Sequence, residues 1–312
     1  MASTVPFASI PVISVSRRVY QWLEGSIDGA SVFAVFDRVC NIAVTPDESG
    51  QREIIALVTP QVGDGPLNIV LDDGFDMAAV FPKTPVTCEA GQLTVGEWRF
   101  AVAVAPQWQP RPQWRRLSVA PQRINSLLKL AGQRARAGTL LELVVESGGG
   151  KSSGANGTDM LHGAIKEAMA SMEAGWRCAD ARWLNGVSRL VGLGPGLTPA
   201  GDDFVAGVML ATWLLHDTPG LLCRQWLSVV EGRTTLLSQG LLRRAADGEC
   251  TAAWHRLLAT LSAGSCDEGD TIALLDALLS LGHTSGGDAL AGFFWMCRLL
   301  LGCSPVVAAQ AS

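Results

Sequence analysis

The sequence lacks several patterns that would assign a protein to a class at once. Its eight cysteines include no C-x-x-C pair, and no basic segment followed by an apolar run, the mark of a secretory signal, precedes them. The longest apolar runs, near 204–215 and 289–301, are too short to span a bilayer. We therefore expect a soluble, cytoplasmic protein whose thiols are reduced and serve as small core residues.

Charge is also scarce. Charged residues make up 17% of the 312 residues, against 48% hydrophobic ones, and 24 basic residues face 29 acidic ones without forming a basic stripe. Nucleic acid and anionic membrane are therefore not expected partners. The composition predicts a well-buried globular protein or one with a large partner surface, and the length predicts two domains.

The common catalytic motifs are missing. The four histidines show no H-E-x-x-H spacing, and no G-x-S-x-G, S-x-x-K or strand-linked G-x-G-x-x-G occurs, so no zinc site, common hydrolase or dinucleotide fold is indicated. The stretch 140–153 reads as a strand that runs into a phosphate loop around Lys151. A Walker A motif needs glycine where Val145 stands, so a mobile Gly/Ser-rich loop at 147–157 is the better interpretation.

The pattern along the chain changes once. Short β-rich runs separated by turn residues predict an antiparallel sheet or small barrel in the first third, at Val32–Phe36, Val39–Val44, Ile54–Thr59, Asn68–Leu71 and Leu93–Val104. An amphipathic segment, Val15–Leu23, precedes them. Four prolines between Ala105 and Pro121 exclude a continuous helix there, and we place the domain boundary in this stretch.

The rest of the chain has helical spacing or length. The predicted helices lie near 121–136, 158–174, 178–190, 203–216, 220–230, 234–246, 251–262, 268–281 and 288–301. We therefore predict an α+β protein. Its β-rich N-terminal domain covers 1–116 and its larger, mostly α-helical domain covers 117–312.

A glycine-rich stretch from Gly192 to Gly207 opens one of these helices. Thr198 is placed to act as its N-cap, with Pro199 at the first helical position. The glycines can turn the backbone sharply and expose its N–H groups. Asp202 and Asp203 in the first turn complement the helix dipole but would repel phosphate, which indicates a metal ion, a ligand N–H group or a basic partner. The alternative is that they are only capping acids on a buried helix.

A weaker copy of this motif follows at 282–293. Its T-x-x-G-D pattern runs from Thr284 to Asp288 and again opens an apolar helix. We infer a site built from backbone donors and from these hydroxyl and carboxylate groups. His283 is a candidate proton carrier or a simple loop residue, and Arg233 is a candidate for binding phosphate or carboxylate or an exposed cap residue.

The sequence G-L-G-P-G-L-T-P-A-G-D-D-F, from Gly192 to Phe204, resembles the signature of the AllH-type subunit family of oxamate carbamoyltransferase. The segments 233–242 and 283–292 resemble two further landmarks of that family, one of which includes Ser238. The resemblance implies a subunit that interconverts oxalurate plus phosphate with oxamate plus carbamoyl phosphate in anaerobic allantoin breakdown. It also implies FdrA-type and AllG-type partner subunits and a small-molecule substrate.

Together these observations give a set of candidate site residues. The catalytic candidates are Asp202, Asp203, Asp288 and His283, and the substrate-binding candidates are Gly194, Gly196, Thr198, Gly201, Arg233, Ser238, Thr284, Gly286 and Gly287. No metal ligands are assigned, although the aspartates could hold a divalent cation such as Mg²⁺ that bridges phosphate. We expect 194–203 and 283–288 to line one cleft, with their carboxylates within about 10 Å and Arg233 or Ser238 reaching it.

Two alternatives stay open at this point. The S-T-R-T phosphate signature of ordinary carbamoyltransferases is absent, so the main active site could lie on a partner. The chain would then be a non-catalytic scaffold or regulatory subunit. It could also be a stand-alone enzyme that acts on another ureido or amide substrate.

Overall fold

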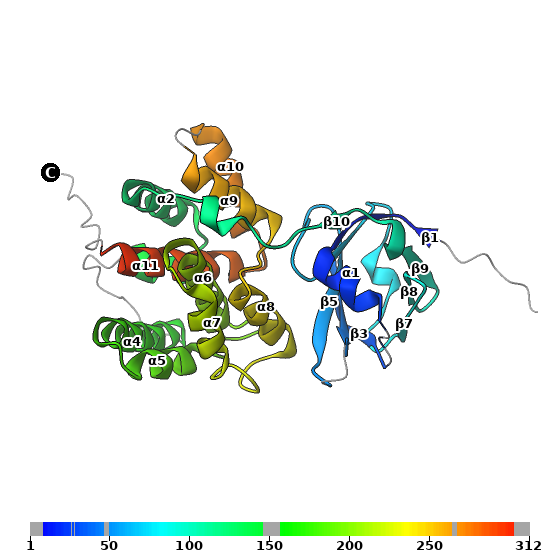
Figure 1. Cartoon of the computed structure of the whole chain (residues 1–312), viewed down its shortest axis with the longest axis horizontal. Coiled ribbons are helices and arrows are strands. Elements are labelled where there is room, and N and C mark those ends of the chain that lie inside the picture. Colours follow the sequence, from blue (N-terminus) through cyan, green and yellow to red (C-terminus); the bar gives the residue numbers. More distant parts are fainter. Residues whose placement is uncertain are drawn as a thin grey trace, which may run out of the picture. The chain divides into compact units, whose positions relative to one another are not determined.

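The computed structural model describes residues 9–25, 27, 29–46, 50–145, 157–263 and 267–302. These residues form two compact units. The β unit comprises the described residues up to Pro112 together with Glu249–Ala252, and the helical unit comprises Gln113–Gly248 and the described residues from Ala253 onward. Figure 1 shows the elements of each. This confirms the predicted α+β class, with a β-rich N-terminal part and a helical remainder.

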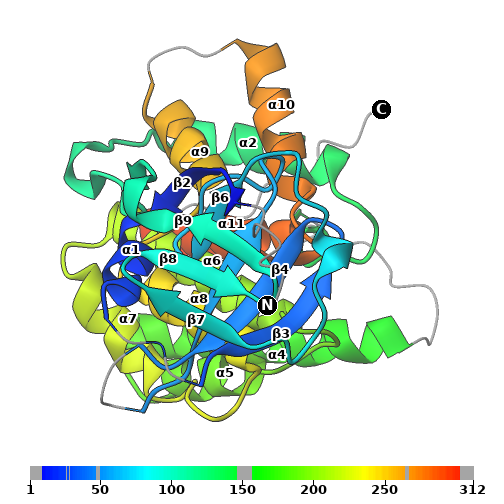
Figure 2. The same ribbon diagram turned by 90° about the vertical axis from the view of Figure 1, so that its right-hand side faces the viewer.

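Two sheets build the β unit, and both appear in Figure 2. One has the order β10-β2-β6-β5-β4-β3 and the other the order β1-β9-β8-β7. Both are mixed, because β10 with β2, β5 with β6 and β1 with β9 pair in parallel while the other neighbours are antiparallel. The strands are β1 (Ser9–Ile10), β2 (Val12–Ser16), β3 (Ser31–Phe36), β4 (Val39–Val44), β5 (Glu53–Val58), β6 (Asn68–Leu71), β7 (Val86–Glu89), β8 (Gln92–Val95), β9 (Trp98–Ala101) and β10 (Gln107–Trp108).

One hydrophobic core joins the two sheets. Every second residue of a strand faces this core, as the two-residue period of a strand requires. On β4, for example, Cys40, Ile42 and Val44 belong to it. Helix α1 (Arg17–Leu23), inside the predicted amphipathic segment, adds Val19. The predicted strand Leu93–Val104 is too long. It is divided by a turn at Gly96, where φ is 56°, and its end forms the short 3₁₀ helix η2 (Val102–Val104).

All nine predicted helices are present, with ends that differ by a few residues. They are α2 (Pro121–Arg134), α4 (Gly157–Cys178), α5 (Arg182–Leu190), α6 (Ala200–Leu215), α7 (Pro219–Leu227), α8 (Leu236–Ala246), α9 (Ala252–Ser262), α10 (Glu268–Leu279) and α11 (Ser285–Leu301). One expectation is wrong, because the start of the predicted strand at 140–145 is the short helix α3 (Leu141–Val145). The predicted loop that follows it lies largely outside the described residues.

Helices α6 and α11 lie side by side in the middle of the helical unit (Figure 1). Two glycines make their close approach possible. A Cβ on Gly207 would lie 1.9 Å from the Ala289 carbonyl oxygen, and a Cβ on Gly292 would lie 1.9 Å from the Phe204 carbonyl oxygen. Only glycine lets the two backbones touch at these points. Gly207 and Gly292 each lie about two turns after the start of their helix. The contact between the helices is therefore close to both glycine-rich motifs.

No described helix has the combination of length and apolar character that a membrane crossing requires. The six cysteines within the described ranges form no disulfide, and four of them are buried. Burial raises the pKa of the Cys40 thiol to about 12 and also raises the pKa of Cys223 and Cys250. These three thiols therefore stay protonated and serve as small core residues. Cys266 and Cys303 lie outside the described residues.

Candidate functional site

The glycine-rich loop before α6 takes a backbone path that requires glycine. Gly192, Gly194 and Gly196 have φ values of 76°, 120° and 94°, in the left-handed region. A Cβ on Gly192 would also lie 2.6 Å from the Arg233 carbonyl oxygen, so the loop passes directly against the segment before α8. This part of the motif is explained by backbone geometry.

The predicted N-cap role of Thr198 is wrong. Helix α6 begins at Ala200, and Pro199 occupies the N-cap position with φ −52° and ψ 141°. The Pro199 carbonyl accepts hydrogen bonds from the amides of Asp202 and Asp203, at 2.9 and 3.2 Å. Thr198 lies one residue further out and uses its hydroxyl for a different contact, a hydrogen bond of 2.9 Å with the Ser285 hydroxyl at the start of α11.

Asp202 ties the loop to α8. Its side chain is buried, and its carboxylate accepts hydrogen bonds from the Gly192 amide (2.8 Å) and from the Thr234 hydroxyl. Burial raises the pKa of Asp202, while hydrogen bonds from Thr234, Gly192 and Ser238 lower it in part. Both carboxylate oxygens of Asp202 therefore accept hydrogen bonds, and these bonds connect the glycine-rich loop to the segment before α8.

The start of α8 is held on the same loop. The Thr235 hydroxyl donates to the Leu197 carbonyl and accepts from the Ser238 amide at 3.1 Å, which caps the helix. The buried Ser238 hydroxyl also donates to the Leu197 carbonyl, at 3.4 Å. Arg233 differs, because its side chain is exposed and its guanidinium donates to the Ser188 hydroxyl on α5.

Asp203 has a different environment from its neighbour. It is half-buried, and its Oδ2 atom is shielded from solvent without a hydrogen-bond partner among the described residues. Burial raises the pKa of Asp203 well above its ordinary value. The negative charges of Asp288 and Asp202 raise this pKa further, and a hydrogen bond from Ser285 opposes them. The carboxyl of Asp203 therefore holds a proton more firmly than an ordinary aspartic acid.

Asp288, in the first turn of α11, is the most buried of the three, with 1% of its surface exposed. Its Oδ1 accepts a hydrogen bond of 2.8 Å from the Leu140 amide, just before α3, while its Oδ2 has no described partner. Burial raises the pKa of Asp288 to about 6, against hydrogen bonds from the Leu140 amide and the Thr284 hydroxyl.

The structure thus brings the two glycine-rich motifs together. The hydrogen bond between Thr198 and Ser285 joins them, and the charge of Asp288 acts on Asp203. Ser238 on α8 contacts the first motif at Leu197 and Asp202. That these residues line one cleft, with carboxylates within about 10 Å, stays a prediction. His283 is exposed beside the second motif.

Several predicted substrate-binding glycines have packing reasons for their identity. A Cβ on Gly201 would lie 2.0 Å from the Leu190 carbonyl oxygen, and one on Gly286 would lie 1.8 Å from that of Leu278. Gly287 packs against Thr139 and Gly194 against the Ala200 amide. Only Gly196, at the exposed tip of the loop, has open space beside it in this set. Substrate contact by these glycines stays a prediction.

Sequence reasoning did not assign three groups that hold the carboxylates: the Thr234 hydroxyl, the Ser285 hydroxyl and the Leu140 amide. The two hydroxyls stand beside the predicted candidates Arg233 and Thr284, which is a weak signal. The Leu140 amide gave none, because its segment read as a strand. Lys151 lies outside the described residues.

The described residues include no group of three or more histidine, cysteine, aspartate or glutamate side chains arranged to hold a metal ion. The arrangement instead offers buried carboxyl groups with raised pKa values beside a loop that is partly exposed. Such groups can donate a proton to a neutral polar ligand, remove a proton from it, or accept hydrogen bonds from its N–H groups. They would repel an anion.

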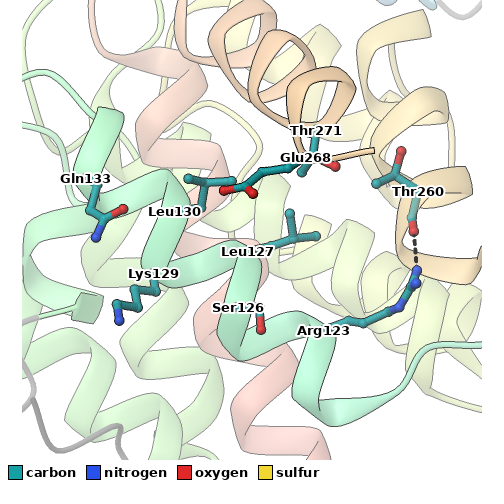
Figure 3. Close-up of a pocket in the computed structure, with 9 residues that line it drawn as sticks. All are labelled: Arg123, Ser126, Leu127, Lys129, Leu130, Gln133, Thr260, Glu268 and Thr271. Carbon is teal, nitrogen blue, oxygen red and sulfur yellow. Dashed lines mark hydrogen bonds between the residues drawn. The ribbon is translucent and has the colours of Figure 1, made fainter. Parts of the chain in front are cut away.

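Another hollow in the helical unit serves as a comparison. It has a volume of about 470 Å³ and lies among α2, the end of α9 and the start of α10. Figure 3 shows Arg123 near Thr260, whose carbonyl accepts a hydrogen bond from the Arg123 guanidinium at 2.7 Å. Lys129 also lines the cavity, but its side chain points away from this hydrogen bond. None of the predicted site residues lines this cavity, so it gives no independent support to the candidate site.

Comparison with known protein families gives two matches. The model described as oxamate carbamoyltransferase subunit AllH matches residues 190–297, which include both glycine-rich motifs and α8. The model described as AllH family N-terminal domain matches residues 11–107, which cover most of the β unit. No solved structure matches the chain.

Proposed function

The chain belongs to the AllH family of oxamate carbamoyltransferase subunits, and on this premise we propose that it takes part in the reaction itself. In this reaction oxalurate and phosphate are interconverted with oxamate and carbamoyl phosphate, as a step of anaerobic allantoin breakdown. We propose that FdrA-type and AllG-type proteins are its partner subunits. The observation that carries the proposal is the shielded Asp203 Oδ2 atom, which has no partner among the described residues and feels the charge of Asp288.

The chemistry needs a proton at one defined atom. A phosphate oxygen attacks the ureido carbonyl carbon of oxalurate, the bond from that carbon to the oxamate nitrogen breaks, and the leaving nitrogen takes up a proton. A protonated carboxyl group can supply it, and the resulting carboxylate can remove the same proton in the reverse direction. Asp203 suits this role, because burial and two neighbouring charges raise its pKa and its side chain is only half-buried.

The other two aspartates then have supporting roles. Asp288 is almost fully buried and keeps the proton on Asp203 through its charge. Asp202 is held by donors on both oxygens and fixes the loop that carries Gly194 and Gly196. This division explains why the motif contains two adjacent carboxylates that are not equivalent.

The phosphate must be bound by other groups. Three carboxyl groups disfavour a dianion, and Arg233, the predicted anion-binding residue, donates to Ser188. Oxalurate also carries a carboxylate, so we propose that the cationic groups for phosphate and for this carboxylate come from a partner subunit. The chain would then supply the proton-transfer half of a shared active site.

The test is reconstitution. The chain is purified with and without the FdrA-type and AllG-type proteins, and formation of carbamoyl phosphate from oxalurate and phosphate is measured. We expect activity only in the complex. In that complex Asp203→Asn should lower kcat by about 10²–10⁴-fold, the usual contribution of a general acid. Asp270→Asn is the matched control, since Asp270 is an exposed aspartate in the first turn of α10.

Two outcomes would favour the alternatives. Full activity of Asp203→Asn in a complex that still needs this chain would indicate a scaffold or regulatory subunit. Activity of the isolated chain on another ureido or amide compound would indicate a stand-alone enzyme.

A further inference from the structure

A cavity lined by tryptophan lies among α4, α5 and α7, apart from the aspartate cluster. Its volume is about 560 Å³, within the range of small-ligand pockets. Three of the ten tryptophans of the chain, Trp176, Trp183 and Trp226, line it, together with Leu222, Gln225 and Asp180. Neither the family matches nor the proposed reaction gives this cavity a role.

The rings form a compact aromatic wall. The ring centroids of Trp176 and Trp183 are 5.2 Å apart, and those of Trp183 and Trp226 are 5.0 Å apart. A close approach of α4 and α5 holds them, because a Cβ on Gly175 would lie 2.0 Å from the Trp183 amide nitrogen. Trp183 and Trp226 are buried, while Trp176 is half-buried and also contacts the His216 ring at 5.8 Å.

A buried donor of the wall, the Trp183 indole, has no acceptor among the described residues. Trp183 is 6% exposed, and its indole Nε1 is shielded from solvent with no hydrogen-bond partner among the described residues. A buried tryptophan N–H normally has a partner. The charged lining residue, Asp180, is already paired with Arg182 at 2.7 Å, so the cavity presents little free charge to a ligand.

We propose that this cavity binds an uncharged, planar aromatic heterocycle whose ring nitrogen accepts a hydrogen bond from the Trp183 indole. The half-buried Trp176 ring offers a face for stacking, which favours flat rings over branched aliphatic groups. Because this Nε1 atom is shielded from solvent, the proposed hydrogen bond requires the surrounding rings to shift when the ligand enters. The unpartnered donor favours a ring with an acceptor over a ring of the same size without one.

The position of the cavity connects it to the aspartate cluster through ring contacts. Trp183 stacks on Trp295 at 6.3 Å, and Trp295 packs on Phe204 at 5.6 Å. Phe204 follows Asp203 directly in the chain. A ligand on Trp183 therefore contacts the ring series against which the first turns of α6 pack, although the binding proposal does not depend on the reaction.

Quinoline and indole are the probes, since both are flat two-ring compounds of similar size and only the quinoline nitrogen is an acceptor. Binding to the purified full-length chain is measured by titration calorimetry, with ligand-observed NMR for weak affinities. We expect quinoline to bind about tenfold more tightly than indole, the effect of one recovered hydrogen bond. Trp183→Phe keeps a ring and removes the donor, so it should make the two affinities equal.

A second variant locates the bound probe. Ala181 is exposed and lines the cavity, so Ala181→Trp should fill it without disturbing the core. We expect this variant to keep the melting temperature of the native chain and to lose quinoline binding. The proposal is overturned by equal affinities in the native chain, by quinoline binding that survives Ala181→Trp, or by no binding of either probe. A partner subunit that binds the native chain but not Ala181→Trp, with no probe binding, would identify the cavity as a protein contact instead.

Discussion

Asp202, Asp203 and Asp288 each stand in the first turn of a helix, yet their surroundings differ. Asp202 receives donors on both oxygens, Asp288 on one, and Asp203 keeps a shielded Oδ2 atom without a described partner. The helix dipole acts on all three in the same sense. The difference in their chemistry therefore comes from burial and from side chains far away in the sequence.

The raised pKa of Asp288 makes a prediction about stability. Its pKa is about 6 in the folded chain, against about 3.9 in an unfolded one. The folded state thus holds the proton more tightly, so the stabilising contribution is complete below about pH 4 and is lost as the pH rises through 6. Because asparagine has no charge, the unfolding free energy of Asp288→Asn relative to the native chain should rise by about 2 kcal/mol between pH 4 and pH 7.

Urea denaturation at several pH values between 4 and 7 measures this difference. Asp270→Asn, which changes an exposed first-turn aspartate, should show no comparable pH dependence. A constant difference between Asp288→Asn and the native chain over this range would contradict the burial argument.

Thr234 gives a second prediction at this scale. Its hydroxyl donates to the buried carboxylate of Asp202. Thr234→Val keeps the shape and removes the donor, so we expect a loss of about 1–3 kcal/mol in unfolding free energy. Thr234→Ser keeps the hydroxyl and should recover most of that loss. Chemical denaturation of the three proteins makes the comparison, and equal losses in both variants would show that the methyl group matters more than the hydrogen bond.

The residue types at these helix starts could be read from the sequence, but their partners could not. The T-x-x-G-D spacing correctly placed Asp202, Asp203 and Asp288 in first turns. Thr198 was misassigned because a threonine before Pro199 fits the usual cap pattern, and only tertiary structure offers it Ser285 instead. The Leu140 amide, 148 residues from Asp288, has no local signal at all.

At the scale of the element, the main helices could be predicted from the length of the segments with helical spacing and from the glycine, proline and aspartate residues that separate them. These signals failed where an element is short. The apolar run at 141–145 reads equally well as strand or helix over five residues, and packing with α11 and α2 decides for α3. The two-residue strands β1 and β10 exist only through parallel pairing with β9 and β2, which no local pattern encodes.

The crossing of α6 and α11 makes the element-level prediction. Gly207→Ala would place a Cβ 1.9 Å from the Ala289 carbonyl oxygen, which the backbones can accommodate only by moving apart. We expect a loss of more than about 3 kcal/mol, at the upper end of single substitutions, and loss of activity in the complex. Thermal and urea denaturation measure the stability.

Gly163→Ala is the matched control for this prediction. Gly163 lies within α4, and a Cβ there would meet no heavy atom within 4 Å. Alanine at this position should stabilise the chain by about 0.5–1 kcal/mol, through its higher helix propensity. If both alanine variants stabilised the chain, the glycines of the crossing would not be required for close packing.

At the scale of the whole molecule, the β unit includes a short segment that comes late in the sequence. Glu249–Ala252 belong to the β unit, although helical segments precede and follow them. Glu249 forms an ion pair with Arg18, whose Nε and Nη2 atoms donate to the Glu249 Oε1 atom at 2.9 and 2.5 Å. The Cys250 and Ala252 amides donate to the Pro110 and Asp64 carbonyls. A boundary between 116 and 117 could be proposed from the prolines, but a contact across 231 residues could not.

The last prediction tests that boundary and this segment together. We expect a fragment of residues 1–116 to fold, because the core that joins the two sheets lies within it. We expect it to be less stable than the same unit in the full chain, because it lacks Glu249–Ala252. Arg18→Met removes the ion pair and leaves the largely buried Glu249 carboxylate without its partner guanidinium, which should cost the full chain about 2 kcal/mol.

In the fragment the same substitution should cost less than about 0.5 kcal/mol, because the partner carboxylate is absent. Hydrogen exchange of the β5 amides measures the stability of the β unit in all four proteins, and it reports on this unit even if the full chain does not unfold in one step. Equal costs of Arg18→Met in fragment and full chain would mean that the ion pair does not stabilise the β unit. A fragment that stays unfolded would show that the β unit requires the returning segment, and that no boundary at 116 separates independent domains.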